Sequence, residues 1–345
     1  MEHSKVVRFY ETGGPEVLTV DQVPLVEPEG NEVRVRVEAL ALNRADLLWR
    51  MGAYIEDPRL PAGIGYDFAG VVEAVGPNVT SLRIGSRVSS FPIASLNTYQ
   101  NHGETAVYPE DGLIEYPSEL SPEEATAVNT TVLTAYFALV EVAKTGPGDA
   151  VVMTAGSSAT ALAALQIAHM RGAIAIATTR TRSKAAQLAA AGFDHVIALD
   201  GEDVAARVLE ITDGRGAHLV YDAVAGPGLE HLALATRVRG HIIVYGALGT
   251  TNGEVTPLPL ASTFARTIRL YAGYKIYDFT GHPQLGLPRD HDATARGTAF
   301  LLEGLRTGQL RPRIDRVFRG LEQYADAQRY MESNTQSGKI VVSLR

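Results

Sequence analysis

The sequence predicts an α/β protein in which a doubly wound parallel sheet is inserted into a β-rich domain. Three observations carry this prediction. Apolar and polar residues alternate in segments of the first third of the chain, which indicates half-buried strands. From 150 to 273, short apolar runs alternate with helical patterns, as in a parallel sheet. After 275 the pattern returns to mixed structure, so the two ends of the chain are expected to form one domain.

The composition is that of an ordinary globular protein. The chain has 345 residues, of which 46% are hydrophobic and 20% are charged. This length suits two domains, with predicted parts 1–125, 126–274 and 275–345. The net charge of −8 argues against a nucleic-acid partner. No apolar run of about 18 residues stands out as a membrane span, and the N-terminus lacks an apolar signal region. The expected location is therefore cytoplasmic.

The first part of the chain reads as strands and turns. Strands are expected at 6–10 and 17–26, on either side of a Gly-Gly-Pro turn. The segment from Glu32 to Ala41 alternates clearly and predicts a half-buried strand. Asn43 then stands where it would cap a short helix that runs through Trp49.

The segment 150–184 predicts a strand, a tight turn, a helix and a second strand, and the second domain is organised around it. An apolar run at 151–154 is broken by small residues, and either Ser157 or Ser158 would cap the following helix. The N-terminus of such a helix offers free N–H groups and a positive dipole end, which suit a pyrophosphate. Of the dinucleotide fingerprint G-x-G-x-x-G only the first glycine, Gly156, is present, and we expect it to make the tight turn. An ordinary βαβ unit without a ligand is the alternative.

The end of the second predicted strand favours NADP over NAD. No acidic residue occurs from 172 to 193 to bind a ribose 2′-hydroxyl. Thr179 is instead followed by the cations Arg180, Arg182 and Lys184. Cations pair with a 2′-phosphate, whereas a carboxylate would repel it. A solvated basic helix start is the alternative, although cations at a helix N-terminus oppose the dipole.

Further strands are expected at 195–199, 218–223, 241–246 and 268–273, which makes six in the parallel sheet. Helices are expected at 202–212 and 228–237, and after the sheet at 292–307 and 321–333, followed by a last strand at 339–344. The strand at 268–272 would be an exposed apolar edge, which is normally covered by a partner chain. Pairing of this edge with another chain is therefore expected.

A set of short motifs is spread over nearly the whole chain. They are GGPEVL at 13–18, LNRAD at 42–46, GAY at 52–54, PAGIGYDFAGVVEAV at 61–75, GSRV at 85–88, LTAY at 133–136, VYDAV at 220–224 and GK at 338–339. In this order the motifs resemble the medium-chain dehydrogenase/reductase superfamily, and within it the zinc-free quinone oxidoreductase-like branch, and they are specific only as a set. The resemblance implies a Rossmann nucleotide domain inserted in a GroES-like catalytic domain, and it implies a homodimer, because relatives join the edge strands of this sheet across a two-fold axis.

The zinc enzymes of this superfamily carry ligands that this chain lacks. They have Cys in place of Asn43, His-Glu in place of Tyr66-Asp67, and a four-Cys lobe near 91–103, whereas this chain has no cysteine. Its histidines do not fall at ligand spacing. The resemblance therefore predicts a site without metal, and Asp67 is expected to be structural or to support a neighbouring residue.

The resemblance also implies roles for individual residues, each beside a simpler alternative. Asn43 would lie near the nicotinamide and the substrate carbonyl, or act only as a helix cap. The Tyr54 hydroxyl would donate a hydrogen bond to the acceptor, or Tyr54 would only border the cleft between the domains. Thr134 would contact the nicotinamide, or only bond the backbone of its own helix. Lys339 would lie near the cofactor, or only be an exposed lysine. The predicted cofactor-binding set is Asn43, Thr134, Gly156, Ser157, Ser158, Ala159, Thr160, Thr179, Arg180, Lys184, Ala223, Val224, Gly246, Ala247, Leu248 and Lys339; the predicted catalytic pair is Asn43 and Tyr54.

The predicted function is NADPH-dependent reduction of a quinone or an α,β-unsaturated carbonyl, without zinc. An alcohol dehydrogenase-like enzyme and a non-catalytic NADPH-binding protein are the alternatives. A methyltransferase on a similar sheet is disfavoured by the basic cluster after Thr179, because adenosylmethionine has no phosphate there. Hydrolase chemistry is disfavoured because the chain shows no nucleophile elbow.

Overall fold

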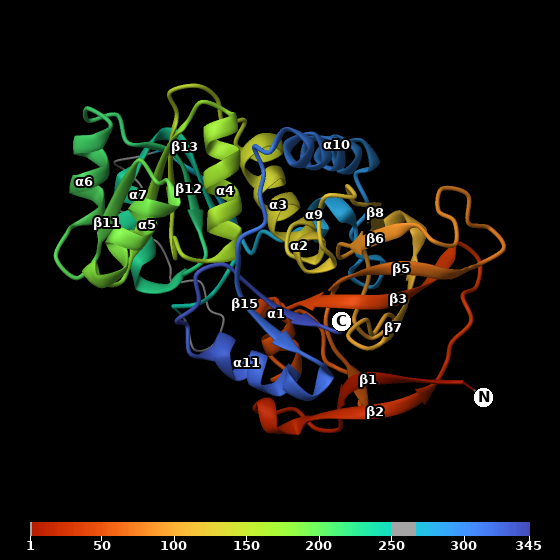
Figure 1. Cartoon of the computed structure of the whole chain (residues 1–345). Coiled ribbons are helices and arrows are strands. Elements are labelled where there is room, and N and C mark those ends of the chain that lie inside the picture. The colour runs from red at the N-terminus through yellow and green to blue at the C-terminus, as the bar shows by residue number, and fades with distance from the viewer. Residues whose placement is uncertain (1, 250–266) are drawn as a thin grey trace. The chain divides into compact units, whose positions relative to one another are not determined.

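The computed structural model describes residues 2–249 and 267–345. The chain divides into two compact units (Figure 1). The first unit comprises Met1–Thr131 and Ile276–Arg345, and the second comprises Val132–Lys275. The second unit is thus an insertion in the first, which confirms the predicted arrangement of a parallel-sheet domain within a β-rich domain.

The first unit takes its strands from both ends of the chain. Its larger sheet contains β3 (Glu32–Ala41), β5 (Asp67–Val75), β6 (Arg87–Ser90), β7 (Thr105–Pro109), β8 (Leu113–Glu115), β15 (Ile314–Arg319) and β16 (Lys339–Ser343). The order is β15-β16-β3-β5-β6-β8, and β7 also pairs with β3. Its smaller sheet contains β1 (His3–Phe9), β2 (Leu18–Pro24) and β4 (Ala62–Gly63), in the order β2-β1-β4.

The alternating pattern of β3 is the reason that it forms a central strand. Val33, Val35 and Val37 are buried on one face, while the polar residues between them are more exposed. Its neighbour β5 carries Gly70, where a Cβ would lie 2.0 Å from the carbonyl oxygen of Arg36. The two strands therefore approach too closely for any side chain at that position.

Some helices of the first unit begin at a residue whose side chain caps them. Ser121 caps the helix α2 (Pro122–Thr126), since its hydroxyl accepts from the Glu124 N–H at 3.2 Å and its N–H donates to the Glu124 carboxylate at 2.9 Å. Asp290 caps α10 (His291–Thr307) with its side chain. This unit also contains the helices α1 (Arg44–Arg50), α9 (Tyr277–Thr280) and α11 (Tyr324–Glu332).

The second unit contains the predicted six-stranded parallel sheet. Its strands are β9 (Ala150–Met153), β10 (Ile174–Thr179), β11 (His195–Ala198), β12 (Ala217–Asp222), β13 (Thr236–Val244) and β14 (Arg269–Ala272). They follow the order β11-β10-β9-β12-β13-β14, which is the doubly wound order of two mononucleotide-binding halves. The strand β13 starts five residues before the predicted position, because Thr236 already pairs with Ala217 ahead of a β-bulge.

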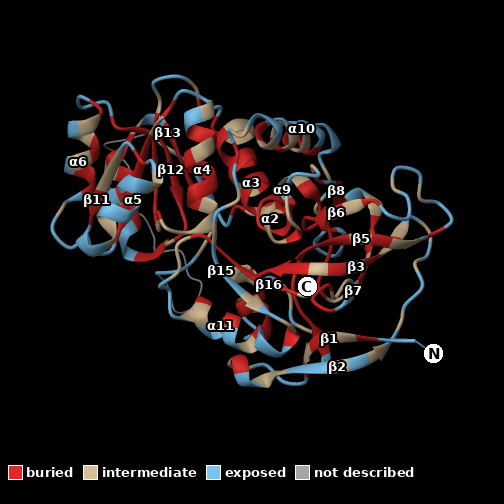
Figure 2. Ribbon diagram, in the orientation of Figure 1, coloured by how far each residue is buried: buried red, intermediate tan, exposed pale blue. Residues whose placement is uncertain are grey.

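Helices cover this sheet, and β9, β10 and β12 are buried almost throughout, whereas β14 at the end of the order is exposed. Figure 2 shows exposed residues on the outer faces of the helices. The helices are α4 (Ala159–Met170), α5 (Ala185–Ala191), α6 (Val204–Ile211) and α7 (Leu229–Ala235). One core cluster joins alternate strand residues such as Val152, Val220 and Ile242 to Val208 of α6 and Leu232 of α7. These strands are apolar on both faces because both faces are buried.

One helical stretch departs from the sequence expectation. Residues 122–142 are long and apolar enough to cross a membrane by length and composition, although no such run was expected. Most of its most apolar window, 72%, is buried inside the protein, as in the core helix of a globular domain. The helix α3 (Asn129–Tyr136) within it passes into a π-helical stretch, Phe137–Val142, whose end is marked by the Ala143 N–H donating to Ala138.

Candidate functional site

The first candidate residue, Asn43, lies at the junction of β3 and α1. It is the N-cap residue of α1, as predicted, and its backbone N–H donates to the Asp46 carboxylate at 2.7 Å. Asp46 is fully buried, and its second oxygen has no hydrogen-bond partner among the residues that the structure describes. Burial, the largest cause, raises the pKa of Asp46 to about 8. A neutral carboxyl group therefore closes the first turn of the helix at neutral pH.

The Asn43 side chain belongs to a polar cluster that joins residues from segments far apart in the sequence. Its Nδ2 donates to Oδ2 of Asp67 at 2.9 Å. The ammonium of Lys339 donates to Oδ1 of Asn43 at 2.6 Å and to Oδ2 of Asp67 at 2.9 Å. The Thr130 hydroxyl donates to the other oxygen of Asp67. Asp67 and Lys339 are 1% and 3% exposed, so the pair is a buried one whose polar atoms satisfy one another.

A buried histidine supports the backbone next to this cluster. His102 contacts the Asp67 carbonyl oxygen through Nε2 at 3.1 Å, and Nδ1 lies 2.6 Å from the Tyr324 hydroxyl. A carbonyl can only accept, so Nε2 carries the proton and the tyrosine donates to Nδ1. Burial lowers the pKa of His102 to about 3, with the nearby Lys339 ammonium also lowering it. His102 is thus a neutral structural residue at physiological pH.

Tyr54, the other predicted catalytic residue, lies at the edge of an aromatic group. Its ring lies 6.4 Å from that of Tyr66, which in turn meets Tyr277 at 6.1 Å. Tyr66 and Tyr277 are buried, while Tyr54 is half-buried. Burial raises the pKa of the Tyr54 hydroxyl, so that it keeps its proton at neutral pH and can donate a hydrogen bond.

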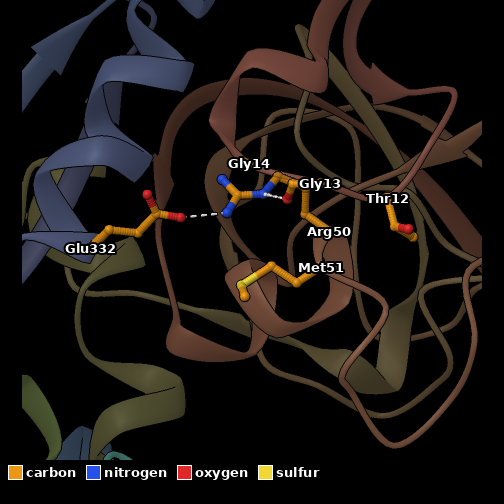
Figure 3. Close-up of a pocket in the computed structure, with 6 residues that line it drawn as sticks. All are labelled: Thr12, Gly13, Gly14, Arg50, Met51 and Glu332. Carbon is orange, nitrogen blue, oxygen red and sulfur yellow. Dashed lines mark hydrogen bonds and ion pairs between the residues drawn. The ribbon is translucent and has the colours of Figure 1, made fainter. Parts of the chain in front are cut away.

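A separate pocket of about 210 Å³ in the first unit is lined by none of the predicted residues (Figure 3). Its buried cation is Arg50, whose Nε donates to the Gly13 carbonyl oxygen at 3.0 Å and whose Nη1 donates to Gln328 at 2.6 Å. Its Nη2 pairs with Glu332, which also lines the pocket. Each nitrogen of this guanidinium already has a protein acceptor, and the Glu332 carboxylate balances its charge, which disfavours an anion in the pocket.

In the second unit, Gly156 lies in the turn between β9 and α4, where the sequence places it. The left-handed backbone belongs to Ala155, with φ of +48°, and not to Gly156. Gly156 has a different requirement, because a Cβ there would lie 2.8 Å from the Cβ of Ala177. Of the two predicted caps, Ser158 is the observed one, and its hydroxyl accepts from the Ala161 N–H at 3.2 Å. Ser157, Ala159 and Thr160 lie beside it and are half-buried.

The carboxyl ends of β12 and β13 lie together beside this turn. Asp222 accepts from the Thr154 hydroxyl at 2.6 Å and from the Val224 N–H at 3.0 Å, so it joins the ends of β9 and β12. The Leu248 N–H donates to the Ala223 carbonyl oxygen at 3.1 Å. At Gly246 a Cβ would lie 2.6 Å from that same oxygen. The exposed residue Ala247 completes this loop.

The basic segment after β10 has an acidic neighbour that the sequence did not reveal. Arg180 and Arg182 are exposed, Lys184 is half-buried, and the Thr179 hydroxyl donates to a backbone carbonyl in the same turn. The Arg182 N–H donates to the Asp200 carboxylate at 3.0 Å. Asp200 follows β11, which pairs in parallel with β10, so the fold brings an acid into a segment that lacks one in sequence.

The remaining candidates in this unit are less closely grouped. Thr134 is half-buried on α3, and its carbonyl oxygen accepts from the Tyr274 hydroxyl at 2.7 Å. The predicted site residues therefore fall into two groups: Asn43, Tyr54 and Lys339 in the first unit, and the others in the second. The cluster around Asp67 was not predicted as a unit, because Lys339 and Thr130 carry no local signal that pairs them with residue 67.

Two family models match the chain, one in each region. Residues 29–117 match the alcohol dehydrogenase GroES-like domain, and residues 159–283 match the zinc-binding dehydrogenase domain. A probable quinone oxidoreductase of Leishmania amazonensis is 30% identical over 326 residues, which cover 94% of this chain and 92% of that protein.

Solved structures agree with these matches. A quinone oxidoreductase of Pseudomonas syringae has a TM-score of 0.86 at 28% identity, covering 99% of this chain and 100% of the other. The quinone oxidoreductase of Escherichia coli, solved with NADPH, has a TM-score of 0.84 at 25% identity, with the same coverage. The chain therefore belongs to the medium-chain dehydrogenase/reductase superfamily, in its quinone oxidoreductase-like branch.

Proposed function

We propose that the protein is an NADPH-dependent oxidoreductase that reduces a quinone or the C=C bond of an α,β-unsaturated carbonyl without zinc. The observation that carries the proposal is the half-buried amide of Asn43, which Asp67 and Lys339 hold in the catalytic unit of an oxidoreductase family. An amide donor suits an acceptor that delocalises incoming negative charge.

The donor set around Asn43 does not fit zinc. The two oxygens of Asp67 are engaged by Thr130, Asn43 and Lys339, so a dication at this carboxylate would meet an ammonium. Within 2–249 and 267–345, no three His, Cys, Asp or Glu side chains gather as a metal site. The chain has no cysteine at all. We therefore assign no catalytic step to a metal.

The second unit fits a dinucleotide at the carboxyl edge of its sheet. The twelve-residue helix α4 presents its N-terminus after Gly156, and a pyrophosphate would be held by Gly156, Ser157, Ser158, Ala159 and Thr160. Thr179, Arg180 and Lys184 would hold a 2′-phosphate. We assign the nicotinamide half to Thr134, Ala223, Val224, Gly246, Ala247 and Leu248. When bound, the cofactor supplies a hydride.

The side chains of the first unit would act on the acceptor. The free N–H of Asn43 and the hydroxyl of Tyr54 would donate hydrogen bonds to the acceptor oxygen as negative charge develops on it. The Tyr54 hydroxyl can serve as a donor at neutral pH, as an ordinary tyrosine can, and burial raises its pKa further. An enone or a quinone spreads the incoming charge and needs only such donors, whereas a plain ketone leaves a localised alkoxide.

An acceptor panel tests this proposal. With NADPH, 1,4-benzoquinone, 1,2-naphthoquinone and a 2-alkenal should each be assayed by loss of absorbance at the reduced-nicotinamide band. A simple secondary alcohol with NADP should be assayed in the opposite direction. We expect turnover of at least one quinone or enone and none of the alcohol, with rates unchanged after exhaustive chelation. Turnover of the alcohol alone, or activity that chelation abolishes and zinc restores, would contradict the proposal.

We also propose that the protein is a homodimer that pairs through β14. This strand ends the six-stranded order in the described part of the chain, and Leu270 and Tyr271 on it are 40% and 39% exposed. Unpaired apolar edges of this kind are commonly covered by a second copy. Light scattering at micromolar concentration should give twice the chain mass of 37.0 kDa. Leu270→Lys should shift the mass toward the monomer, whereas a monomeric parent protein would overturn the proposal.

A further inference from the structure

We infer that Lys339 and Asp67 fix the orientation of the Asn43 amide, so that Lys339 promotes the reaction through Asn43 and not as a ligand of the cofactor. The inference rests on the proposed function and gives Lys339 a role different from the cofactor contact expected from sequence. Lys339 and Asp67 are positioning residues in this scheme.

The orientation follows from what each partner can do in a hydrogen bond. An ammonium group can only donate and a carboxylate can only accept. Lys339 lies 2.6 Å from Oδ1 of Asn43, and Asp67 lies 2.9 Å from its Nδ2. Turning the amide over would place its NH₂ against the ammonium and its oxygen against the carboxylate. Both charge-assisted hydrogen bonds would be lost and two repulsive contacts would replace them.

The two partners are themselves held firmly. Lys339 and Asp67 lie 2.9 Å apart and are almost fully buried, so water does not compete for either group. The Thr130 hydroxyl donates to the remaining oxygen of Asp67, and His102 donates to its backbone carbonyl. Asp67 and Lys339 thus hold the amide directly, while Thr130 and His102, from two other segments, hold Asp67.

The fixed amide presents one donor. Of the two N–H bonds on Nδ2 of Asn43, Asp67 accepts from one, and no acceptor for the other occurs within 2–249 and 267–345. The residue itself is half-buried. A cation on the amide oxygen draws electron density from the nitrogen, and hydrogen bonds in such a chain strengthen one another. The free N–H of Asn43 is therefore both oriented and strengthened by Lys339.

A double-mutant cycle separates action through Asn43 from an independent role. Asn43→Ala should lower kcat by about 100-fold or more, and Lys339→Met by about 10-fold or more, as for loss or misplacement of an oxyanion donor. In the Asn43→Ala background, Lys339→Met should lower kcat little further, because Lys339 acts through the amide that Asn43→Ala has already removed. Multiplicative effects would overturn the inference, as would a Lys339→Met variant that binds NADPH weakly but keeps its kcat.

A charge-neutral variant covers the case in which Lys339→Met fails to fold. Asp67→Asn combined with Lys339→Met removes both charges of the pair, so no buried charge is left alone. Asn at 67 can donate or accept, so the Asn43 amide loses its fixed orientation. We expect a folded protein with kcat about 10-fold or more below the parent value. Lys5→Met, which breaks an exposed pair with Glu322, is the control and should leave kcat unchanged. Parent-like kcat in the neutral variant would overturn the inference.

A readout without turnover distinguishes failure of the inference from failure of the proposed function. In nitrogen-15 NMR spectra, the Asn43 side-chain amide is identified as the signal lost in Asn43→Ala. Its two protons should have well-separated shifts in the parent protein and should move toward free-amide values in the neutral variant. If no acceptor is turned over but this change occurs, the proposed function fails and the orienting role stands. If the amide shifts were the same in the parent protein and the neutral variant, the orienting role would be refuted even for an active enzyme.

Discussion

The free energy of unfolding is expected to fall as the pH rises toward 8, because Asp46 must lose a proton inside the protein. Burial is the largest cause of its raised pKa of about 8; the Asn43 N–H and Lys339 lower that pKa, whereas the Asp67 carboxylate raises it. In an unfolded chain the pKa of Asp is about 3.9. The contribution of Asp46 is therefore complete below about pH 4 and is lost as the pH rises through about 8. The slope from this group is at most about 1.4 kcal/mol per pH unit.

Comparison with Asp46→Asn isolates this group from the other carboxylates. The amide oxygen can still accept from the Asn43 N–H, but it cannot ionise. Urea unfolding of both proteins between pH 5 and 8.5 should show the parent losing stability relative to the variant as the pH rises. Asp326→Asn, at an exposed helix carboxylate, is the control and should follow the parent curve. Parallel curves for the parent and Asp46→Asn would show that Asp46 ionises normally.

NADPH is expected to bind about 10-fold or more tightly than NADH, which corresponds to one charge-assisted pair of roughly 1.5–3 kcal/mol. We expect the exposed guanidinium of Arg180 to make most of this difference in affinity, because it has no ion pair within the described residues. Fluorescence titration of both cofactors measures the ratio. Arg180→Ala should weaken NADPH far more than NADH, and added salt should reduce the preference.

Two further variants sharpen this test. Arg207→Ala removes another arginine of the second unit, one that already pairs with Glu202 and Glu210, and should leave the ratio unchanged. Asp200→Asn removes the carboxylate beside the basic segment and should tighten NADPH more than NADH. Equal affinities of the parent protein for the two cofactors would refute the preference.

Regular patterns made much of the fold predictable. The period-two alternation in β3 and the apolar runs of the parallel sheet are local signals, and both led to the observed strands. The π-helical stretch 137–142 and the left-handed backbone of Ala155 were missed. The identities of Ala155 and Phe137 do not predict these backbone conformations, because conformations of this kind persist only where the surrounding structure imposes them.

The candidate site was predictable only in part, for the same reason. Asn43 and Tyr54 lie in motifs that can be recognised along the chain. The pairing of Asn43 with Lys339 spans 296 residues and arises only because β16 lies beside β3. Likewise, Asp200 reaches Arg182 through the pairing of β11 with β10. No local pattern encodes contacts of this kind, since they depend on sheet order.

The sheet order also determines which unit has all its strands first while the chain is being synthesised. The second unit is continuous and has all six strands of its described sheet once residue 272 has been made. The first unit must wait for β16, whose Val341 and Ser343 pair with Ala41 and Ala39 of β3. At roughly 5–20 residues per second, the ribosome needs several seconds more to reach that strand. The Asn43 amide therefore has no ammonium beside it until Lys339 has emerged from the ribosome.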